Sequence, residues 1–280
     1  MNNIISIIVL STILFSCKKD KAQEPELELL FSSGFEGVVL EPLTEGYQNI
    51  SGTDSETGFS WPISIWGASE ETGLHLIFDD NQQALQNKLE TVIGHNGDST
   101  TALYNVEFYE AEDATQNTYE ILDLVNSRQD LYVKYWMKLD SASLTQKDKW
   151  RVLFEYKTEG YRFGTGYRLI AFIYTDEDGK PYWHFQGDRN PQHPIWQIEN
   201  YNIPVPMNEW FMVEYYWKWS NHKDGLSGWK VNGQLIGENQ GATTRLNRKI
   251  DFIILTQIYG DANPKHQWID DIEIWNRKPN

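Results

Sequence analysis

Short runs of alternating residue character, rich in aromatic and β-branched side chains, constrain this fold more than any other feature. Successive side chains of a β-strand point to opposite faces, so period-two alternation indicates a strand with one buried face. Segments 81–89 and 114–125 offer room for a helical turn, without sustained helical periodicity. Five runs carry the strand pattern most clearly: Leu131 to Leu139, Trp150 to Lys157, Tyr167 to Tyr174, Trp210 to Trp219 and Trp268 to Trp275.

Turn-forming residues separate these runs. Asp176-Glu177-Asp178-Gly179 is expected to turn the chain between the strand ending at Tyr174 and a strand over Tyr182 to Gln186. Asn232-Gly233 lies between two short apolar runs and is the strongest hairpin signal in the chain. Many strands joined by tight turns predict an all-β fold of two antiparallel sheets, a sandwich or jelly roll.

Composition excludes a largely disordered chain and disfavours a nucleic-acid-binding protein. The chain has 280 residues with 12 Trp, 15 Tyr and 12 Phe, which is far more buriable surface than a disordered chain carries. Its 40 acidic and 24 basic residues give a net charge of −16, which disfavours a nucleic-acid partner. Because no linker or charge block interrupts the chain after Leu29, we expect one domain over residues 29–280.

The N-terminal residues predict an export signal. Residues 1–16 contain no charged side chain, and the apolar run Ile4 to Phe15 has the length of a signal-peptide core. The run ends in Leu14-Phe15-Ser16-Cys17, which resembles the lipobox of bacterial lipoproteins and contains the only cysteine of the chain. A buried N-terminal strand with a chance cysteine is the weaker alternative.

The lipobox resemblance implies a domain plan. Residues 1–16 would be a cleaved signal peptide, Cys17 the lipidated residue, and residues 17–28 a flexible tether. The protein would then be exported and anchored by lipid to the cell envelope, at the outer membrane; the side that it faces stays open.

The two faces of each expected strand differ in character. Alternation over Trp150 to Lys157 groups Trp150, Val152, Phe154 and Tyr156 on one face and Arg151, Leu153, Glu155 and Lys157 on the other. In Trp210 to Trp219, alternation predicts an apolar face made of Phe211, Val213, Tyr215, Trp217 and Trp219. Aromatic rings beside hydrogen-bonding groups suit sugars, whose C–H faces stack on Trp or Tyr. For any single Trp, burial in a large two-sheet core is the more ordinary explanation.

Three segments resemble the concanavalin A-like jelly roll shared by lectins, laminarinase-type glucanases and several polysaccharide lyases. They are Phe31 to Gly37, the stretch from Asn208 to Gly233, and the closing run Trp268 to Trp275. The resemblance covers roughly residues 29–276 and implies the fold more strongly than an activity.

The resemblance also implies a structural calcium ion. In many such jelly rolls, carboxylates from the first and last strands meet at Ca²⁺, and the matching positions are Glu36 and Asp271, with Asp270 as a substitute. The alternative, ordinary carboxylates on a solvated strand edge, is equally open.

The acidic residues disfavour a glucanase. Its Glu-x-Asp-x-x-Glu strand does not occur here; Glu107, Glu110 and Asp113 lie close together but in a different arrangement.

A polysaccharide lyase needs a Tyr or His base and groups that neutralise a uronate carboxylate. The candidate catalytic residues are Arg151, Tyr182, His184 and Gln257. The alginate-lyase strand motifs are not intact; the nearest pieces are Arg151 to Glu155 and a reversed His184-Phe185-Gln186. Because the chain is acidic, an anionic polymer requires a locally basic groove, for which the sequence offers Arg151, Lys157, Arg162, Arg168 and Arg189.

Three functions therefore stay open. An envelope-anchored lipoprotein that binds or processes a polysaccharide on the concave face of the jelly roll is the leading interpretation. A lyase acting by β-elimination on a uronate polymer, and an adhesion or structural lipoprotein without a glycan role, are the alternatives. The expected glycan-binding residues are Trp183, Trp196, Tyr259, Glu155 and Lys157.

Overall fold

The computed structural model describes most of the region after the predicted tether. The described residues are 26–42, 47–61, 73–77, 85–109, 118–121, 130–189, 193–255 and 258–279. The predicted signal peptide, Cys17 and most of the tether lie outside them.

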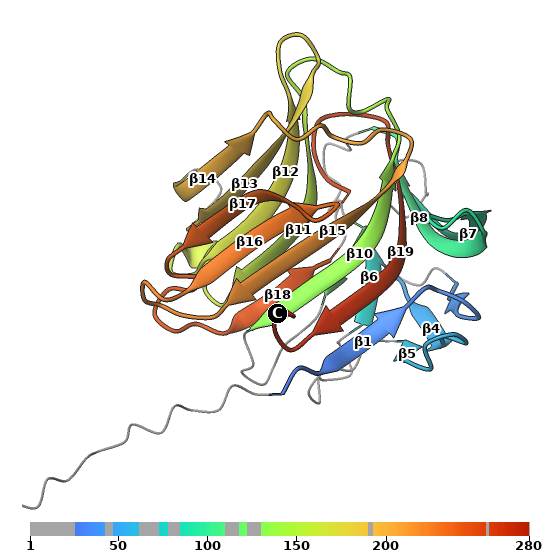
Figure 1. Cartoon of the computed structure of the whole chain (residues 1–280), viewed down its shortest axis with the longest axis horizontal. Helices are drawn as coiled ribbons and strands as arrows, with labels where there is room; N and C mark the ends of the chain where they lie inside the picture. Colours follow the sequence, from blue (N-terminus) through green and yellow to red (C-terminus); the bar gives the residue numbers. More distant parts are fainter. Residues whose placement is uncertain are drawn as a thin grey trace, which may run out of the picture.

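The first sheet has eight antiparallel strands (Figure 1). Seven of them follow the order β17-β16-β15-β10-β19-β8-β7, and β1 pairs with β19. Their bounds are β1 Leu29–Ser33, β7 Leu85–Ile93, β8 Ser99–Glu107, β10 Leu131–Leu139, β15 Trp210–Lys218, β16 Leu226–Val231, β17 Gln234–Gln240 and β19 Lys265–Trp275.

The second sheet also has eight antiparallel strands, in the order β14-β13-β12-β11-β18-β9-β6-β3. Their bounds are β3 Tyr47–Gln48, β6 Gly73–Ile77, β9 Thr118–Ile121, β11 Trp150–Thr158, β12 Arg168–Thr175, β13 Pro181–Asp188, β14 Pro194–Asn200 and β18 Ile250–Ile254. A small sheet joins β2 (Val39–Leu40), β4 (Ile50–Thr53) and β5 (Ser60–Trp61).

The chain crosses repeatedly between the two large sheets. It runs through β10 in the first sheet, β11 to β14 in the second, β15 to β17 in the first, β18 in the second and β19 in the first. This crossing between stacked antiparallel sheets is a jelly-roll sandwich, so the predicted fold class is confirmed.

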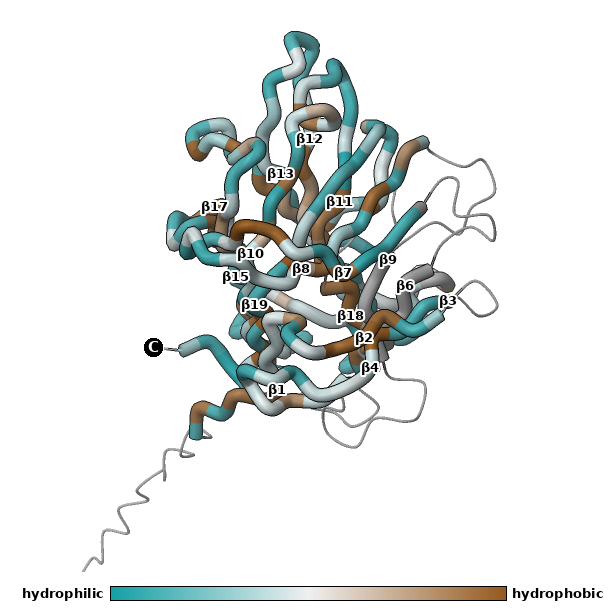
Figure 2. The backbone as a smooth tube through the Cα atoms, turned by 90° about the vertical axis from the view of Figure 1, so that its right-hand side faces the viewer, coloured by the Kyte–Doolittle hydropathy of each residue, from teal (hydrophilic) through white to brown (hydrophobic). Residues whose placement is uncertain are grey.

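One apolar core fills the space between the sheets. Phe154 of the second sheet stacks on Tyr215 of the first at 4.1 Å between ring centroids, and Trp183 packs edge-on against Trp229 at 5.0 Å. Figure 2 shows the apolar stretches mainly along the strands, whereas the hairpin turns at the top of the view are mostly hydrophilic. Large aromatic side chains therefore supply much of the buried surface that stabilises the sandwich.

The predicted turns are present. Asn232 and Gly233 both have positive φ, 48° and 73°, as a two-residue hairpin of the primed type requires, and they join β16 to β17. The turn after β12 is closed by a hydrogen bond from Gly179 N to Asp176 O. Segment 85–89, which offered room for a helical turn, belongs to β7 instead.

Within the described ranges, the one helical element is the 3₁₀ turn η1, Tyr161–Phe163. No helix in this part of the chain has the length and apolar character needed to cross a membrane.

Candidate functional site

The outer face of the second sheet collects the polar and aromatic side chains that the core excludes. In β12, Leu169, Ala171 and Ile173 join the main core, so the alternate residues must point outward. The strand register places these side chains in one field across β11 to β14: Val152, Glu155, Lys157, Arg168, Ile170, Phe172, Tyr174, Tyr182, His184, Gln186, Asp188, Gln197 and Glu199.

Arg168 is the centre of a buried ionic network on this face. Its Nη2 lies 2.8 Å from Asp188 Oδ2, and its Nη1 lies 3.3 Å from Glu155 Oε2. Lys157 Nζ pairs with Glu155 Oε1 at 2.6 Å, and the Tyr161 hydroxyl donates to Asp188 Oδ1 at 2.8 Å. Burial opposes the charged form of Arg168, but the carboxylates of Glu155 and Asp188 outweigh it and raise its pKa. Both cations of the network are therefore already neutralised by the protein.

A hydrogen-bonded row extends this network toward β14. Gln186 Nε2 donates to Asp188 Oδ2 at 2.8 Å, and Gln186 Oε1 lies 2.9 Å from His184 Nε2. The other ring nitrogen of His184 lies 3.7 Å from Glu199. Gln186 Oε1 can accept a hydrogen bond from His184 only when the hydrogen is on Nε2. The row therefore favours the imidazole tautomer with the hydrogen on Nε2. The His184 side chain is thus held in a fixed orientation.

Aromatic rings form a column at the other end of the field. Tyr174 and Tyr182 stack with centroids 5.9 Å apart, and Tyr182 stacks on Tyr201 at 4.3 Å. Tyr174 also contacts the His184 ring at 5.0 Å. Tyr201 is 51% exposed and donates a hydrogen bond to Glu199 at 3.0 Å. The column, which we call the tyrosine column (Tyr174, Tyr182 and Tyr201), therefore connects the buried row to solvent.

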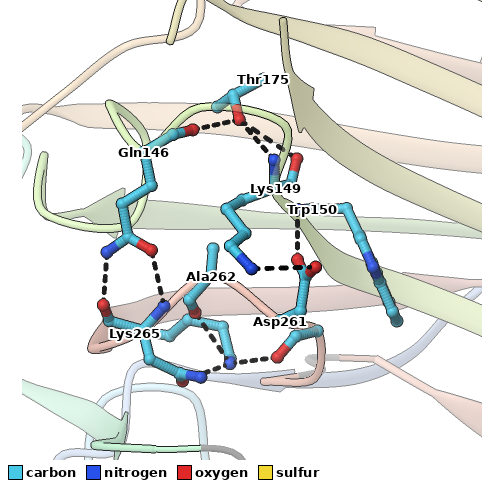
Figure 3. Close-up of polar contacts among 9 residues, drawn as sticks. Gln146, Lys149, Trp150, Thr175, Asp261, Ala262 and Lys265 are labelled. Atoms are coloured by element: carbon cyan, nitrogen blue, oxygen red, sulfur yellow. Dashed lines mark hydrogen bonds and ion pairs between the residues drawn. The ribbon is translucent and has the colours of Figure 1, made fainter. Parts of the chain in front are cut away.

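A fully buried lysine holds the loop between β18 and β19 from inside (Figure 3). The Lys265 ammonium donates to the carbonyls of Gly260 and Ala262, at 2.6 and 2.9 Å, and to Asn263 Oδ1 at 2.7 Å. The carboxylate of Glu107 lies 2.7 Å from the same nitrogen and compensates its charge. The loop is thereby organised around the ammonium group of a side chain of the same polypeptide.

The same loop is tied to the second sheet and carries Tyr259. The side-chain amide of Gln146 bonds both the N–H and the carbonyl of Asn263, and Trp150 N donates to Asp261 Oδ1 at 2.8 Å. Tyr259 packs edge-on against Trp150 at 5.2 Å, on the outer face of the second sheet. Its position there depends on these anchors.

Five residues of the predicted site share this outer face, although the alternation had not grouped them in this way. They are Tyr182, His184, Glu155, Lys157 and Tyr259. Gln257 lies outside the described residues.

Arg151 does not belong to the field, contrary to the expectation. It is 1% exposed, points between the sheets, and donates to Gln267 Oε1 of β19 at 2.8 Å and to Ser143 Oγ at 3.2 Å. Complete burial lowers its pKa to about 10. A β-bulge between Val152 and Phe154 explains the difference, because the extra residue exchanges the faces on either side of it.

Two of the predicted sugar-stacking residues face the core. Trp183 is 0% exposed and donates to the carbonyl of Ile203 at 2.9 Å, so it has no free ring face. Trp196 is half-buried, packs against Phe185 at 5.2 Å and donates to the Tyr167 hydroxyl at 3.0 Å. The expectation that Trp183 stacks on a glycan is therefore wrong, whereas Trp196 is partly exposed and its stacking on a glycan stays a prediction.

Sequence reasoning did not assign Arg168, Asp188 and Tyr201 to the site. The sequence indicates Arg168 only as a source of positive potential, whereas its two carboxylate partners make it a structural centre. The available signal was spacing: Asp188 follows His184 and Gln186 at two-residue intervals and so shares their face.

The predicted calcium ligands Glu36, Asp270 and Asp271 lie together at another place. The Thr100 hydroxyl lies 3.1 Å from Glu36 Oε1 and 3.2 Å from Asp270 Oδ2, while Asp271 Oδ2 lies 2.7 Å from His95 Nε2. Burial, together with the neighbouring Asp271 carboxylate, raises the pKa of Asp270 to about 7. Across the described ranges, no group of three or more His, Cys, Asp or Glu side chains is arranged to hold a metal ion. Calcium binding thus stays a prediction.

The fold and this face define a two-sheet jelly-roll protein of the architecture that the concanavalin A-like resemblance implies. No protein-family model and no curated protein sequence matches the chain.

Solved structures with a similar fold include several polysaccharide lyases. The alginate lyase Aly36B, as a double mutant in complex with alginate trisaccharide, is 13% identical with a TM-score of 0.49, covering 70% of this chain and 88% of its own. The endo-β-1,4-glucuronan lyase from the fungus Trichoderma reesei is 14% identical with a TM-score of 0.45, covering 68% and 87%. The cellulose induced protein Cip1 is 16% identical with a TM-score of 0.45, covering 87% and 96%.

Proposed function

We propose that this protein binds a polysaccharide at the tyrosine column on the outer face of the second sheet. The observation that carries the proposal is that the stacked rings of Tyr182 and Tyr201 lie directly beside a row of oriented hydrogen-bonding groups. Tyr201 is the exposed end of this arrangement. Sugar rings present C–H faces to aromatic side chains and hydroxyl groups to polar ones, and both are present here. Lipidation at Cys17 would hold this binding face at the cell envelope.

The parts of the field have separate roles in this proposal. Tyr201 supplies the stacking surface, Tyr182 packs against its inner ring face, and Glu199 accepts hydrogen bonds from sugar hydroxyls. The ionic network around Arg168 is buried, with Asp188 0% and His184 6% exposed, so it supports the column from below. Of the predicted glycan-binding residues, Glu155 and Lys157 belong to the network that supports the column. Tyr259 forms a second aromatic edge with Trp150.

Affinity electrophoresis in gels containing neutral or uronate polysaccharides tests this binding. Tyr201→Ala should weaken binding by about tenfold or more, because a partly exposed stacking ring is lost. Tyr109→Ala is the matched control, since Tyr109 is 47% exposed and follows β8 of the other sheet. Equal retardation of both variants on every polymer would refute the proposal and leave an adhesion or structural role.

β-Elimination on a uronate polymer is the second candidate function. It is favoured by the placement of His184, Gln186 and Tyr182 on one face, where His or Tyr could remove the proton α to a uronate carboxyl group. Gln186 could hydrogen-bond the developing charge. Tyr182 is the more accessible base, since it is half-buried whereas His184 is buried.

Unsaturated sugar ends absorb ultraviolet light, so incubation with a panel of uronate polymers measures this activity directly. Tyr182→Phe keeps the ring and removes the hydroxyl group, so it should abolish elimination if Tyr182 is the base and leave binding nearly unchanged. His184→Ala should abolish elimination if His184 is the base, and it should affect binding only through the support that the buried row gives to the tyrosine column. If no polymer yields absorbance while binding is retained, the enzyme is excluded.

A further inference from the structure

Two neighbouring loops differ in charge from the rest of the chain. Residues 160–166 form the central part of the connection between β11 and β12, and residues 241–249 connect β17 to β18. Together they contain no acidic residue and four basic ones, Arg162, Arg245, Arg248 and Lys249, in a chain of net charge −16. Even with the flanking Glu159 and Asp251 included, the basic residues outnumber the acidic ones. We call these two loops the basic loop pair.

Direct hydrogen bonds join the two loops into one surface. Arg245 Nη1 donates to the carbonyl of Gly164 at 2.8 Å, and Glu159 N donates to the carbonyl of Lys249 at 2.9 Å. Below them, the Tyr156 hydroxyl donates to the carbonyl of Thr243 at 2.9 Å. The loop pair is therefore anchored to the core and to itself.

Large apolar side chains stand at the tips of this surface. Phe163 is 86% and Leu246 70% exposed, the two highest values for large apolar residues in the described part of the chain. Phe163 precedes Gly164 and Leu246 follows Arg245, so both flank the hydrogen bond that joins the loops. Leu246 and Asn247 also have positive φ, 55° and 52°, which side chains larger than glycine seldom adopt.

The loop pair lies at the end of the sandwich where the first described residues, from Glu26 onward, are held. Thr243 bonds the carbonyl of Lys218 at the end of β15, and Trp219 N donates to Asp130 just before β10. At this end of β10, Tyr132 pairs with Trp275, and the next residue, Asn276, bonds the first described residues, Glu26 and Glu28. Figure 1 shows the C-terminus and the start of β1 at this end of the molecule.

We propose that the basic loop pair docks on a membrane surface that contains anionic lipid. Phe163 and Leu246 would enter the boundary between headgroups and acyl chains, and Arg245, Arg248 and Lys249 would lie near the lipid phosphates. Charge complementarity accounts for the cations, and the exposed apolar tips favour a lipid surface over an anionic polymer. A short tether from the same end would keep this surface next to the membrane, and the outer face of the second sheet would stay available.

Vesicle co-sedimentation of the full chain carrying Cys17→Ser tests the proposal without a lipid anchor. Phosphatidylcholine vesicles with and without phosphatidylglycerol are compared in this background. Phe163→Ser with Leu246→Asn should weaken binding to anionic vesicles by about tenfold or more, and Asn tolerates the left-handed backbone. Arg248→Glu with Lys249→Glu should remove the preference for anionic vesicles, and added salt should reduce it in the parent. Unchanged thermal unfolding verifies that the variants fold.

Ile93→Ser is the matched control. Ile93 is 63% exposed at the opposite end of the sandwich, where its carbonyl accepts a hydrogen bond from Trp210 at the start of β15. This variant should bind vesicles like the parent. Equal vesicle binding by the parent and the apolar double variant would overturn the proposal. A second result would also overturn it. If Arg248→Glu with Lys249→Glu lost binding to soluble polygalacturonate but still bound vesicles like the parent, the surface would serve an anionic polymer.

Discussion

Arg168 and Asp188 face each other across β12 and β13, with Nη2 of the arginine 2.8 Å from Oδ2 of the aspartate. Their side chains are 10% and 0% exposed, and Asp188 also accepts hydrogen bonds from Tyr161 and Gln186. A buried pair of this kind fixes the geometry around it, because either charge left alone would be strongly destabilising.

Removal of one partner should therefore destabilise the fold. We expect Asp188→Ala to lower the free energy of unfolding by about 3 kcal/mol, measured by urea denaturation, because Arg168 loses its nearest carboxylate. Asp224→Ala is the control: Asp224 and Lys218 are 64% and 55% exposed, so the loss of this solvent-screened pair should be much smaller. Similar losses for the two variants would show that burial does not strengthen the Arg168 pair.

Adjacent residues of β13 should respond in opposite ways. Trp183→Ala removes a fully buried ring and should cost about 3–5 kcal/mol of unfolding free energy. Tyr182→Ala, on the outer face, should cost much less stability and instead weaken polysaccharide binding. Parallel urea denaturation and affinity electrophoresis measure both quantities. If Trp183→Ala stayed stable and lost binding, the assignment of faces would be wrong.

The alkaline stability of the protein should depend on Tyr104. Burial, followed by the carboxylates of Glu90 and Asp140, raises the pKa of Tyr104 to about 12, against about 10 in the unfolded chain. Because the folded state keeps the proton longer, its contribution is present below pH 10 and is lost as the pH rises from about 10 to about 12.

Tyr104→Phe should lose the hydrogen bond to His266 and so be less stable at neutral pH, by about 1 kcal/mol. Its stability should then fall less steeply than that of the parent between pH 10 and pH 12. Urea midpoints at pH 8 and pH 11 measure the difference. An equally steep decline in both proteins would show that Tyr104 does not contribute.

We propose that Ca²⁺ binds beside Glu36 and Asp270, whose carboxylates both lie within hydrogen-bond distance of the Thr100 hydroxyl, with Asp271 next to them in sequence. Addition of Ca²⁺ should then raise the melting temperature, and EGTA should reverse the change, because a ligand bound only by the folded state stabilises it. Asp271→Asn should reduce the response. An unchanged melting temperature in the parent on adding EGTA or excess Ca²⁺ would remove calcium from this description.

The strand framework is predictable from sequence because it rests on local patterns. All five alternating runs are strands, and the hairpin at Asn232-Gly233 follows from residues that accept positive φ. The apolar face expected for Trp210 to Trp219 is also confirmed, since Phe211, Val213 and Tyr215 are fully buried in the core. These features require no knowledge of distant contacts.

The site is less predictable because it depends on a bulge and on register. In β11 the bulge places Arg151 inside and Glu155 and Lys157 outside, although strict alternation groups all three together. In β13 both faces carry aromatic residues, so periodicity alone cannot tell that Trp183 is buried and Tyr182 is not. The pairing of Arg168 with Asp188 arises only when β12 and β13 align in register.

Lys265 stabilises the loop after β18 without a bound metal ion, because its own ammonium group bonds the loop carbonyls. Here the positive charge belongs to the polypeptide itself and is enclosed by Gly260, Ala262, Asn263 and Glu107. The aromatic edge formed by Tyr259 and Trp150 should thus keep its shape in ion-poor or chelating solutions, whatever happens at the carboxylates near Glu36.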